Sequence, residues 1–568
     1  MRILFLTHAF NSLAQRLFVE LEQRGHEVSI EFDIRDSVAI EAVEAFKPNL
    51  IIAPFLKRRI PDQIWRNHLC IIVHPGIKGD RGASSLDWAI SRGDAVWGVT
   101  CLQADAEMDA GDIWASCQFP MRDASKSSIY RNEVSEAALS GVLEVIENHQ
   151  AENFVAQPLA PDAAELSGQW HPYMRQEDRS VDWTIDSTEE ILRKIRAGDG
   201  VPGVLDASLG RSFYLHDACF EERLRGERPG EIIAQREGAI CRATIDGAVW
   251  IGSLRLKPEA EDKPTLKLPA TQLLEGLNEV HESLLDNDYE AGYSTWQPVR
   301  YRVSDQIGYL YFDFYNGAMS TAQCKRLQQA YRHLCSQDVR LVVLMGGADF
   351  WSNGIHLNQI EAAESAADES WNNINAMNDL TREIICTDDR LIVSALRGNA
   401  GAGGVFLSLA ADLVWVRKSV VLNPHYKSMG NLYGSEYWTY LLPKRVGDSN
   451  SAKLTQKRLP IGGVEALELG LIDDCFGSAS TAFESEVISR AKSLVASPDF
   501  DRRLREKREA READESIKPL ERYRDEEMRR MHLNFYGFDS SYHVARYHFV
   551  YKIPKARTPV YLARHRRL

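Results

Sequence analysis

Several features that define membrane, secreted or nucleic-acid-binding proteins are missing from this sequence. No apolar run reaches the roughly 18 residues that a membrane span requires. The nine cysteines include no CxxC pair, which argues against a zinc cluster or a disulfide framework and fits a reducing compartment. Acidic residues outnumber basic ones by 81 to 67, so general binding to nucleic acid is not expected. We expect a soluble, cytoplasmic protein with no membrane span and no metal site.

The rest of the composition is that of a globular protein with several domains. At about 150 residues per domain, the 568 residues correspond to roughly four folding units. Apolar residues make up 44% and charged residues 26%, so the chain has enough apolar side chains for ordinary cores. The opening apolar run meets Thr7 and His8 too soon for the core of a signal peptide, and it predicts a buried strand instead.

The first 165 residues read as one α/β domain. Short apolar runs at residues 3–6, 27–32, 50–53 and 70–73 alternate with amphipathic stretches. This alternation is typical of a doubly wound, Rossmann-like sheet. No GxGxxG sequence follows the first run, so the usual dinucleotide ligand is not supported.

The rest of the chain predicts four further segments. Residues 166–270 contain short strands separated by glycine-bearing turns, which favours a small OB-like β-barrel. Residues 271–292 read as a linker, and residues 293–485 again alternate strands with helices. Residues 486–568 form a helical and aromatic segment, within which 21 of the 30 residues 501–530 are charged. Mixed charges at helical spacing predict a solvated helix, so the fold class is a multidomain α/β protein with a helical tail.

His74 is the first candidate for chemistry. It ends the apolar run at residues 70–73, so it should lie at the carboxyl edge of the sheet, where open α/β sheets bind ligands. Asp109 and Asp112 follow 35 and 38 residues later, just before another apolar run. A histidine beside a carboxylate can do acid–base work at a carbonyl group, because the carboxylate sets the tautomer and the imidazolium stabilises an oxyanion. On these residues alone, a surface histidine and a turn aspartate remain the alternative.

Two glycine-bearing turns in the third folding unit are the second candidate. DFWSNGIHL at residues 349–357 follows one apolar run, and RGNAGAGG at residues 397–404 follows another. Backbone N–H groups at such turns can point together at an oxyanion, and glycine lets a substrate approach the backbone closely. Glycines that serve packing alone are the alternative reading.

The motif HPG…RGAxxxxWAI…G…VTC…MDAGDI in the first region resembles that of the folate-dependent formyltransferases. Val-Asp-Trp at residues 181–183 and the stretch 191–203 are similar to the C-terminal subdomain of the transfer-RNA branch, so the resemblance spans residues 1–257. It implies formyl-tetrahydrofolate as the donor and a catalytic set of Asn, His and Asp. His74 and Asp109 occupy two of these positions, but Ile72 stands at the Asn position, which argues against ordinary formyl transfer to an amine. The donor-binding residues that the resemblance implies are Arg81, Gly82 and Asp112.

The two turns resemble the FSxGxDL loop and the NGxxxGGG turn of the crotonase (enoyl-CoA hydratase/isomerase) superfamily. The match covers residues 300–480. It implies an oxyanion hole formed by the amides of Ile355 and Gly403, with coenzyme A bound nearby. The binding residues implied with them are Gly354 and Gly404.

Departures from the crotonase pattern narrow the chemistry of this second site. Phe406 and Tyr426 stand where the two hydratase glutamates are expected, and His356 replaces the Asp of the loop. Water addition to an enoyl thioester is therefore not expected. Tyr426 is a candidate to donate or guide a proton, with a core aromatic as the alternative, and Glu436, expected on a helix after residues 431–434, is a second candidate.

Both modules together, with the C-terminal FYGFDSSYHVARYHFVYKIPKARTPVYLARHR, resemble the HypX (HoxX) family of hydrogenase maturation proteins over nearly the whole chain. The resemblance implies carbon monoxide synthesis for the iron of [NiFe]-hydrogenase. The formyl group would be released, or passed to coenzyme A, at the first site, and formyl-CoA would be decarbonylated at the second. The implied partners are small-molecule substrates and the hydrogenase maturation machinery.

Three other functions remain open. The first is formylation of an amine, on a sugar nucleotide or transfer RNA, with the crotonase unit as a scaffold. The second is a coenzyme A hydrolase or isomerase whose first half binds folate as a sensor. The third is a non-catalytic assembly factor that docks through a basic tail formed by Arg557, Arg564, Arg566 and Arg567.

Overall fold

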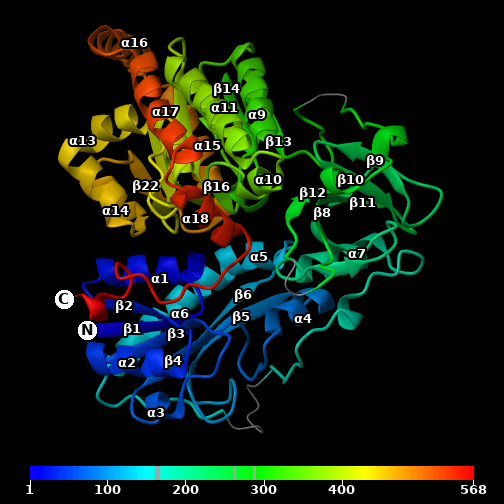
Figure 1. Ribbon diagram of the computed structural model, residues 1–568, viewed down its shortest axis with the longest axis vertical. Coiled ribbons are helices and arrows are strands. Elements are labelled where there is room, and N and C mark those ends of the chain that lie inside the picture. Colours follow the sequence, from blue (N-terminus) through cyan, green and yellow to red (C-terminus); the bar gives the residue numbers. More distant parts are fainter. Residues whose placement is uncertain (160–166, 261–263, 286–288, 568) are drawn as a thin grey trace. The chain divides into compact units, whose positions relative to one another are not determined.

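The computed structural model describes residues 1–159, 167–260, 264–285 and 289–567, and its chain divides into two compact units (Figure 1). The first unit comprises Met1–Ser283, Ser294–Trp296 and Lys555–Leu568. The second comprises Leu284–Tyr293 and Gln297–Pro554. The chain therefore leaves the first unit, builds the second and returns to the first. The multidomain α/β class is confirmed, whereas the five segment boundaries drawn from the sequence stay a prediction.

A six-stranded sheet in the order β2-β1-β3-β4-β5-β6 organises the start of the first unit. Its first four strands, β2, β1, β3 and β4, are parallel to one another, and β5 runs antiparallel to both of its neighbours, β4 and β6. Nearly every residue of β1 and β3 is buried, as expected for inner strands covered on both faces. The elements are β1 (Arg2–Thr7), α1 (Ser12–Gln23), β2 (Glu27–Phe32), α2 (Asp36–Phe46), β3 (Leu50–Phe55), α3 (Asp62–Trp65), β4 (Cys70–His74), α4 (Ser85–Arg92), β5 (Val96–Gln103), β6 (Ile113–Pro120), α5 (Lys126–Ile129), η1 (Tyr130–Val134) and α6 (Ser135–Gln150).

A second sheet of the first unit is antiparallel throughout, in the order β7-β8-β11-β10-β9 with β12 beside β11. It occupies the region in which the sequence predicts a small barrel. A capping box between Ser187 and Glu190 starts its helix α7. The elements are η2 (Glu177–Arg179), α7 (Thr188–Ala197), β7 (Val204–Asp206), β8 (Phe213–Glu221), β9 (Ile232–Arg236), β10 (Ala239–Ala243), β11 (Ala248–Leu256), β12 (Lys267–Pro269), α8 (Ala270–Leu273) and η3 (Leu277–Glu279).

The second unit contains a six-stranded sheet in the order β13-β14-β15-β17-β19-β22 and a small sheet in the order β16-β18-β20-β21. From β14 onward the large sheet is parallel, so its carboxyl ends lie at one edge. The elements are β13 (Val299–Ser304), β14 (Ile307–Phe312), η4 (Tyr315–Gly317), α9 (Thr321–Cys335), β15 (Leu341–Leu344), β16 (Phe350–Ser352), α10 (Leu357–Ala362), α11 (Ala366–Cys386), β17 (Leu391–Leu396), β18 (Asn399–Gly401), α12 (Gly403–Leu409), β19 (Leu413–Arg417), β20 (Val421–Asn423), α13 (Trp438–Lys457), β21 (Ile461–Gly462), α14 (Gly463–Glu468), β22 (Asp474–Phe476) and α15 (Ser480–Val495).

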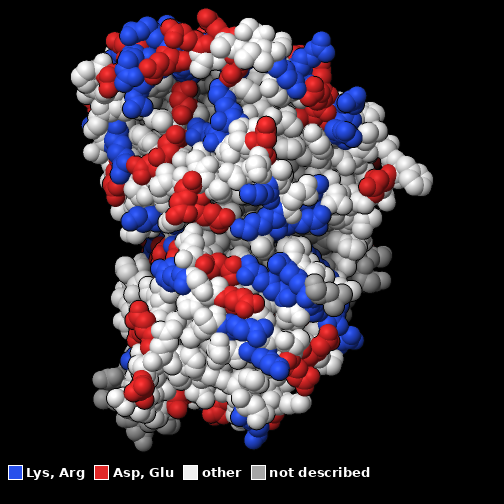
Figure 2. Space-filling model, turned by 90° about the vertical axis from the view of Figure 1, so that its left-hand side faces the viewer, with Lys and Arg blue, Asp and Glu red and all other residues white. Residues whose placement is uncertain are grey.

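Three more helices follow: α16 (Phe500–Ile517), α17 (Leu520–Tyr536) and α18 (Ser541–Val550). The solvated helix predicted from the charge run is confirmed for α16, whose exposed side chains form ion pairs such as Arg502–Glu506 at 2.8 Å. Basic and acidic side chains are likewise interspersed on the face in Figure 2. For α17 the prediction is wrong, because one side of this helix is buried in the second unit. Among the described helices, none has the length and apolar character of a membrane span.

The last residues of the chain pack on the edge strand β2 (Figure 1). The amide of Ile30 donates to the carbonyl of Leu562 at 3.1 Å, and His565 lies 2.9 Å from the buried carboxylate of Glu31. The tail arginines pair inside the first unit, namely Arg557 with Glu41, Arg564 with Glu22 and Arg566 with Glu31. Three of the four tail arginines therefore have acidic partners within the first unit, and docking through this tail stays an untested alternative.

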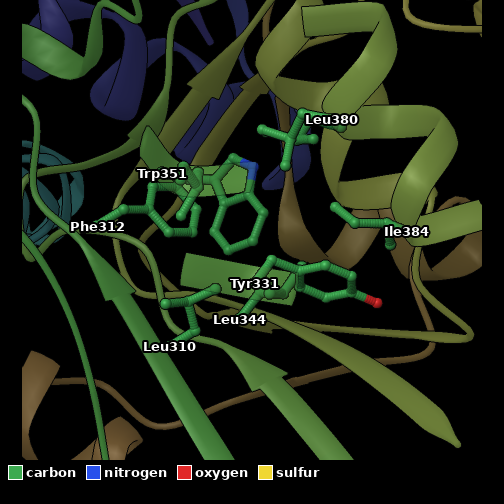
Figure 3. Close-up of a pocket in the computed structure, with 9 residues that line it drawn as sticks. Leu310, Phe312, Tyr331, Leu344, Trp351, Leu380 and Ile384 are labelled. Carbon is green, nitrogen blue, oxygen red and sulfur yellow. The ribbon is translucent and has the colours of Figure 1, made fainter. Parts of the chain in front are cut away.

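A small cavity of about 10 Å³ lies in the core of the second unit (Figure 3). Its lining is apolar apart from the indole N–H of Trp351 and the hydroxyl of Tyr331, which donate to the carbonyl of Gly404 and to Thr387. A space of this size and polarity offers a water molecule no free partner. The cavity is therefore a gap in packing rather than a ligand site.

Candidate functional site

The first cluster surrounds His74, the last residue of β4. The ring nitrogen Nε2 of His74 lies 2.9 Å from Oδ1 of Asp80, and Nδ1 lies 3.6 Å from Oδ2 of Asp109. All three side chains are buried. Position 76 requires glycine, because a Cβ there would overlap both the His74 imidazole and the Asp80 carboxylate. The imidazole therefore sits between two carboxylates.

The loop after β4 is closed by the segment that precedes the second sheet. The amide of Arg81 donates to the carbonyl of Gln169 at 3.1 Å, and the amide of His171 donates to the carbonyl of Arg81 at 2.8 Å. Gly82 has φ +115° and its Cα faces the His171 carbonyl, so only glycine fits there. The amide of Gly82 donates to Asp109 at 3.2 Å, which ties this loop to the β5–β6 loop.

Three residues of this cluster, Asp80, Ser85 and His171, were not predicted from the sequence. Asp80 also accepts a hydrogen bond from the Ser85 hydroxyl, and its Oδ2 lies 3.6 Å from Nε2 of His171. Burial lowers the pKa of His171, whose ring stacks on Trp88. The signal for Asp80 was its place six residues after His74, inside the same glycine-rich loop.

The structure brings most of the other expected residues to this region. Arg81 lies at its rim, 2.6 Å from Glu107 and within 3.3 Å of the carbonyl of Met108. Asp112 is exposed, and no contact among the described residues joins its side chain to the cluster. Its backbone carbonyl pairs with Gln103 instead. Ile72 packs against the apolar core of the sheet.

The second cluster lies in the second unit, where the two glycine turns meet. A Cβ on Gly354 would lie 3.5 Å from the amide nitrogen of Gly403, and a Cβ on Gly404 would overlap the carbonyl of Ser352. Gly403 and Gly404 start helix α12, so their amides have no acceptor within the helix. The Gly354 carbonyl accepts a hydrogen bond from Met319 at 2.9 Å, which fixes the turn before Ile355. Amides without an acceptor inside their own helix and little side-chain bulk therefore coincide at this point.

Tyr426 and Glu436 form a buried pair beside these amides. The Tyr426 hydroxyl donates to the Glu436 carboxylate and lies 2.9 Å from the carbonyl of Ser435. A Cβ on Gly403 would overlap the Glu436 carboxylate, so the pair reaches the start of α12. Burial raises the pKa of Glu436 to about 7, and burial together with the Glu436 charge raises the pKa of Tyr426. At neutral pH this carboxyl can both accept and release a proton.

Glu436 does not lie on a helix, which corrects the expectation from the sequence. It precedes α13, with a left-handed φ of +58°. Two of the residues that depart from the crotonase pattern have structural roles. Phe406 stacks on Tyr426 with ring centroids 5.3 Å apart, and His356 caps α10 by accepting a hydrogen bond from the amide of Gln359. Burial lowers the pKa of His356 to about 4, so this imidazole is neutral. Across the described residues, no group of His, Cys, Asp and Glu side chains is arranged to hold a metal ion.

Three family models match the chain: Formyl transferase at residues 26–146, Formyl transferase, C-terminal domain, at 173–267, and Enoyl-CoA hydratase/isomerase at 314–543. The Hydrogenase maturation factor HoxX of Bradyrhizobium diazoefficiens is 52% identical over 567 residues, covering 100% of this chain and 97% of that protein. The crystal structure of HypX from Aquifex aeolicus in complex with tetrahydrofolic acid is 48% identical, with a TM-score of 0.96 over 100% of this chain and 99% of that one. A methionyl-tRNA formyltransferase of Koribacter versatilis is 26% identical over 41% of this chain and 72% of its own.

Proposed function

The chain belongs to the HoxX/HypX family of hydrogenase maturation factors, and from that membership we propose that it makes carbon monoxide for the iron of a [NiFe]-hydrogenase. The family resemblance drawn from the sequence is thereby confirmed, with a formyltransferase part and a crotonase part in one chain. The carbon comes from formyl-tetrahydrofolate, coenzyme A carries the formyl group, and the hydrogenase maturation machinery receives the product.

The His74 cluster performs the first step, transfer of the formyl group from folate to the thiol of coenzyme A. The thiol sulfur forms a bond to the formyl carbon, the bond from that carbon to the folate nitrogen breaks, and the thiol proton moves to this nitrogen. His74 relays the proton and stabilises the oxyanion that develops on the formyl oxygen. Asp80, at 2.9 Å, fixes the imidazole tautomer, and Asp109 faces the other ring nitrogen. Arg81 and Gly82 are proposed to hold the folate; Asp112, being exposed, is the weakest of the three.

The second cluster converts formyl-CoA into carbon monoxide and free coenzyme A. The amides of Ile355 and Gly403 hold the carbonyl oxygen. Gly354 leaves the Gly403 amide uncovered, and Gly404 lets α12 begin directly against the Ser352 carbonyl, beside the proposed thioester site. Glu436 takes the formyl hydrogen as a proton, the C–H electron pair stays on carbon, and the C–S pair leaves with sulfur. Tyr426 protonates the sulfur and recovers its proton from Glu436 through their hydrogen bond.

The observation that carries this proposal is the position of Glu436, buried against Gly403 and bonded to Tyr426. A hydratase needs its two glutamates to activate water, and in this chain Phe406 and Tyr426 stand at those two positions. Hydrolysis of formyl-CoA to formate is the competing reaction, so a buried acid–base pair that excludes water favours release of carbon monoxide.

Anaerobic incubation with formyl-tetrahydrofolate and coenzyme A, with a haem protein as a trap for carbon monoxide, tests the proposal. We expect carbon monoxide only when protein and coenzyme A are both present. His74→Ala should abolish folate turnover but spare release of carbon monoxide from supplied formyl-CoA. Folate turnover that yields formate alone would instead indicate a hydrolase, and loss of both half-reactions in His74→Ala would refute the division of labour.

A further inference from the structure

The turn that carries Glu436 has an unfavourable backbone conformation. Gly434 has φ +94°, and both Glu436 and Tyr437 have φ +58°, which side chains with a Cβ rarely adopt. Such a turn persists only where its surroundings hold it in place. It leads directly into helix α13, whose first residue is Trp438 and whose N-cap residue Tyr437 gives no side-chain cap.

Glu527 on helix α17 supplies the missing cap. Its Oε2 accepts the amide of Tyr437 at 3.0 Å, and its Oε1 accepts the amide and hydroxyl of Thr439 at 2.9 and 2.6 Å. The side chain is completely buried, although the sequence places it in the charged run that reads as solvated. The Glu527 side chain thereby satisfies free N–H groups at the start of α13.

A second acceptor holds the other side of the same turn. Oδ1 of Asn378, on α11, accepts the amide of Glu436 and the hydroxyl of Ser435, each at 2.8 Å. Its amide group donates to the sulfur of Met528, the residue after Glu527, at 3.1 Å. The backbone on both sides of the Glu436 Cα is therefore anchored by side chains of α11 and α17.

We propose that Glu527 is a positioning residue for the second reaction, which holds the turn at residues 435–439 so that the Glu436 carboxylate meets Tyr426 and Gly403. The proposal rests on the function proposed above for Tyr426 and Glu436. It assigns a role to the C-terminal helix α17, none of whose residues takes part in the reaction proposed above. Burial raises the pKa of Glu527 to about 8, and the nearby Glu436 charge acts in the same direction, so the two buried carboxyls are electrostatically coupled.

The test compares Glu527→Gln with Glu526→Gln, the same change at the neighbouring residue, whose exposed side chain pairs with Lys518. Thr439→Val is a milder variant that removes one hydrogen bond to Glu527 and leaves the carboxylate in place. Full-length protein labelled at the tyrosine Cζ carbon is examined by NMR, and the Tyr426 signal is identified by its loss in Tyr426→Phe. Steady-state kinetics with formyl-CoA and thermal unfolding are measured on the same proteins.

We expect Glu527→Gln to shift the Tyr426 signal, Thr439→Val to shift it less in the same direction, and Glu526→Gln to leave it unchanged. The kcat for carbon monoxide release should fall about tenfold or more in Glu527→Gln, with KM within about twofold, because a displaced reacting group slows chemistry more than binding. Because Glu527 acts through Glu436, the double variant Glu436→Gln/Glu527→Gln should be no slower than Glu436→Gln alone.

An unshifted Tyr426 signal in folded Glu527→Gln protein, or additive losses in the double variant, would overturn the positioning role. A shifted signal in a protein whose wild type releases no carbon monoxide from formyl-CoA would support the positioning of Glu436 and refute the proposed reaction. The two failures are thus distinguished by a readout that does not depend on turnover.

Discussion

Replacing Asp80 with Asn tests whether this carboxylate, rather than that of Asp109, fixes the tautomer of the His74 imidazole. Asp80 is the closer partner, at 2.9 Å against 3.6 Å, and its side chain is fully buried. A hydrogen bond to a charged group contributes about 1.5–3 kcal/mol. If that whole contribution acts on the transition state, at 1.36 kcal/mol per factor of ten, folate turnover should fall about 10- to 150-fold. The amide keeps the size of the side chain, so the fold should change little.

The assay is the rate of tetrahydrofolate release from formyl-tetrahydrofolate in the presence of coenzyme A, with thermal unfolding as a check on folding. Asp36→Asn is the matched control, because Asp36 is an exposed residue of α2 that pairs with Arg58. Release of carbon monoxide from supplied formyl-CoA should be unaffected in both variants. A folded Asp80→Asn protein that turns over folate within about threefold of wild type, well below the range expected from the hydrogen bond, would show that Asp80 does not control His74.

Three further predictions follow from buried groups. Because burial raises the pKa of Glu436 from 4.5 to about 7, carbon monoxide release from formyl-CoA should rise with pH to a plateau above about 7. The folded state holds the extra proton of Glu436 between those values, so this group should lower the unfolding free energy by about 3 kcal/mol as pH rises through that window. Glu436→Gln should make the slope shallower but not flat, because buried Glu527, with a pKa raised to about 8, contributes in the same direction. Gly404→Ala should abolish formyl-CoA turnover and spare folate turnover, since its Cβ would overlap the Ser352 carbonyl. His565→Ala should destabilise the first unit by about 3–5 kcal/mol in denaturant unfolding, because Glu31 loses a buried partner.

Each of these has a clear contrary result. A flat pH profile, or the same stability slope in Glu436→Gln, would mean that another group titrates. Equal loss of both half-reactions in Gly404→Ala would point to general misfolding. An unchanged unfolding midpoint in His565→Ala would show that Arg566 and Thr558 suffice to hold Glu31.

Much of the fold was predictable because many of its strands are short stretches rich in apolar residues, separated by amphipathic stretches. The run predicted at residues 27–32 becomes β2 (Glu27–Phe32), and that at residues 70–73 becomes β4 (Cys70–His74). His74 and the two glycine turns were found because short-range sequence patterns carry them. The structure brings each of these features to a buried cluster.

What could not be predicted depends on contacts between distant residues. Glu527 reads as one charge among many, and only the packing of α17 against α13 shows that it is buried. The left-handed conformation of Glu436 has no local sequence signal, since neither it nor Tyr437 is a glycine. The pairing of Ser29 with His565 joins residues 536 positions apart. Asp80 could not be singled out from the sequence, because only the turn after His74 brings its carboxylate within 2.9 Å of the imidazole.

We propose that this one chain carries the formyl carbon of folate to carbon monoxide through a thioester. The most direct measurement supplies formyl-tetrahydrofolate labelled with ¹³C in the formyl group, together with coenzyme A, and follows labelled formyl-CoA, formate and carbon monoxide over time. We expect labelled formyl-CoA that appears and then declines, with ¹³CO forming after tetrahydrofolate and finally reaching the same amount. In Tyr426→Phe, labelled formyl-CoA should accumulate instead. Labelled formate as the end product, with no labelled carbon monoxide, would rule out decarbonylation of formyl-CoA by this chain.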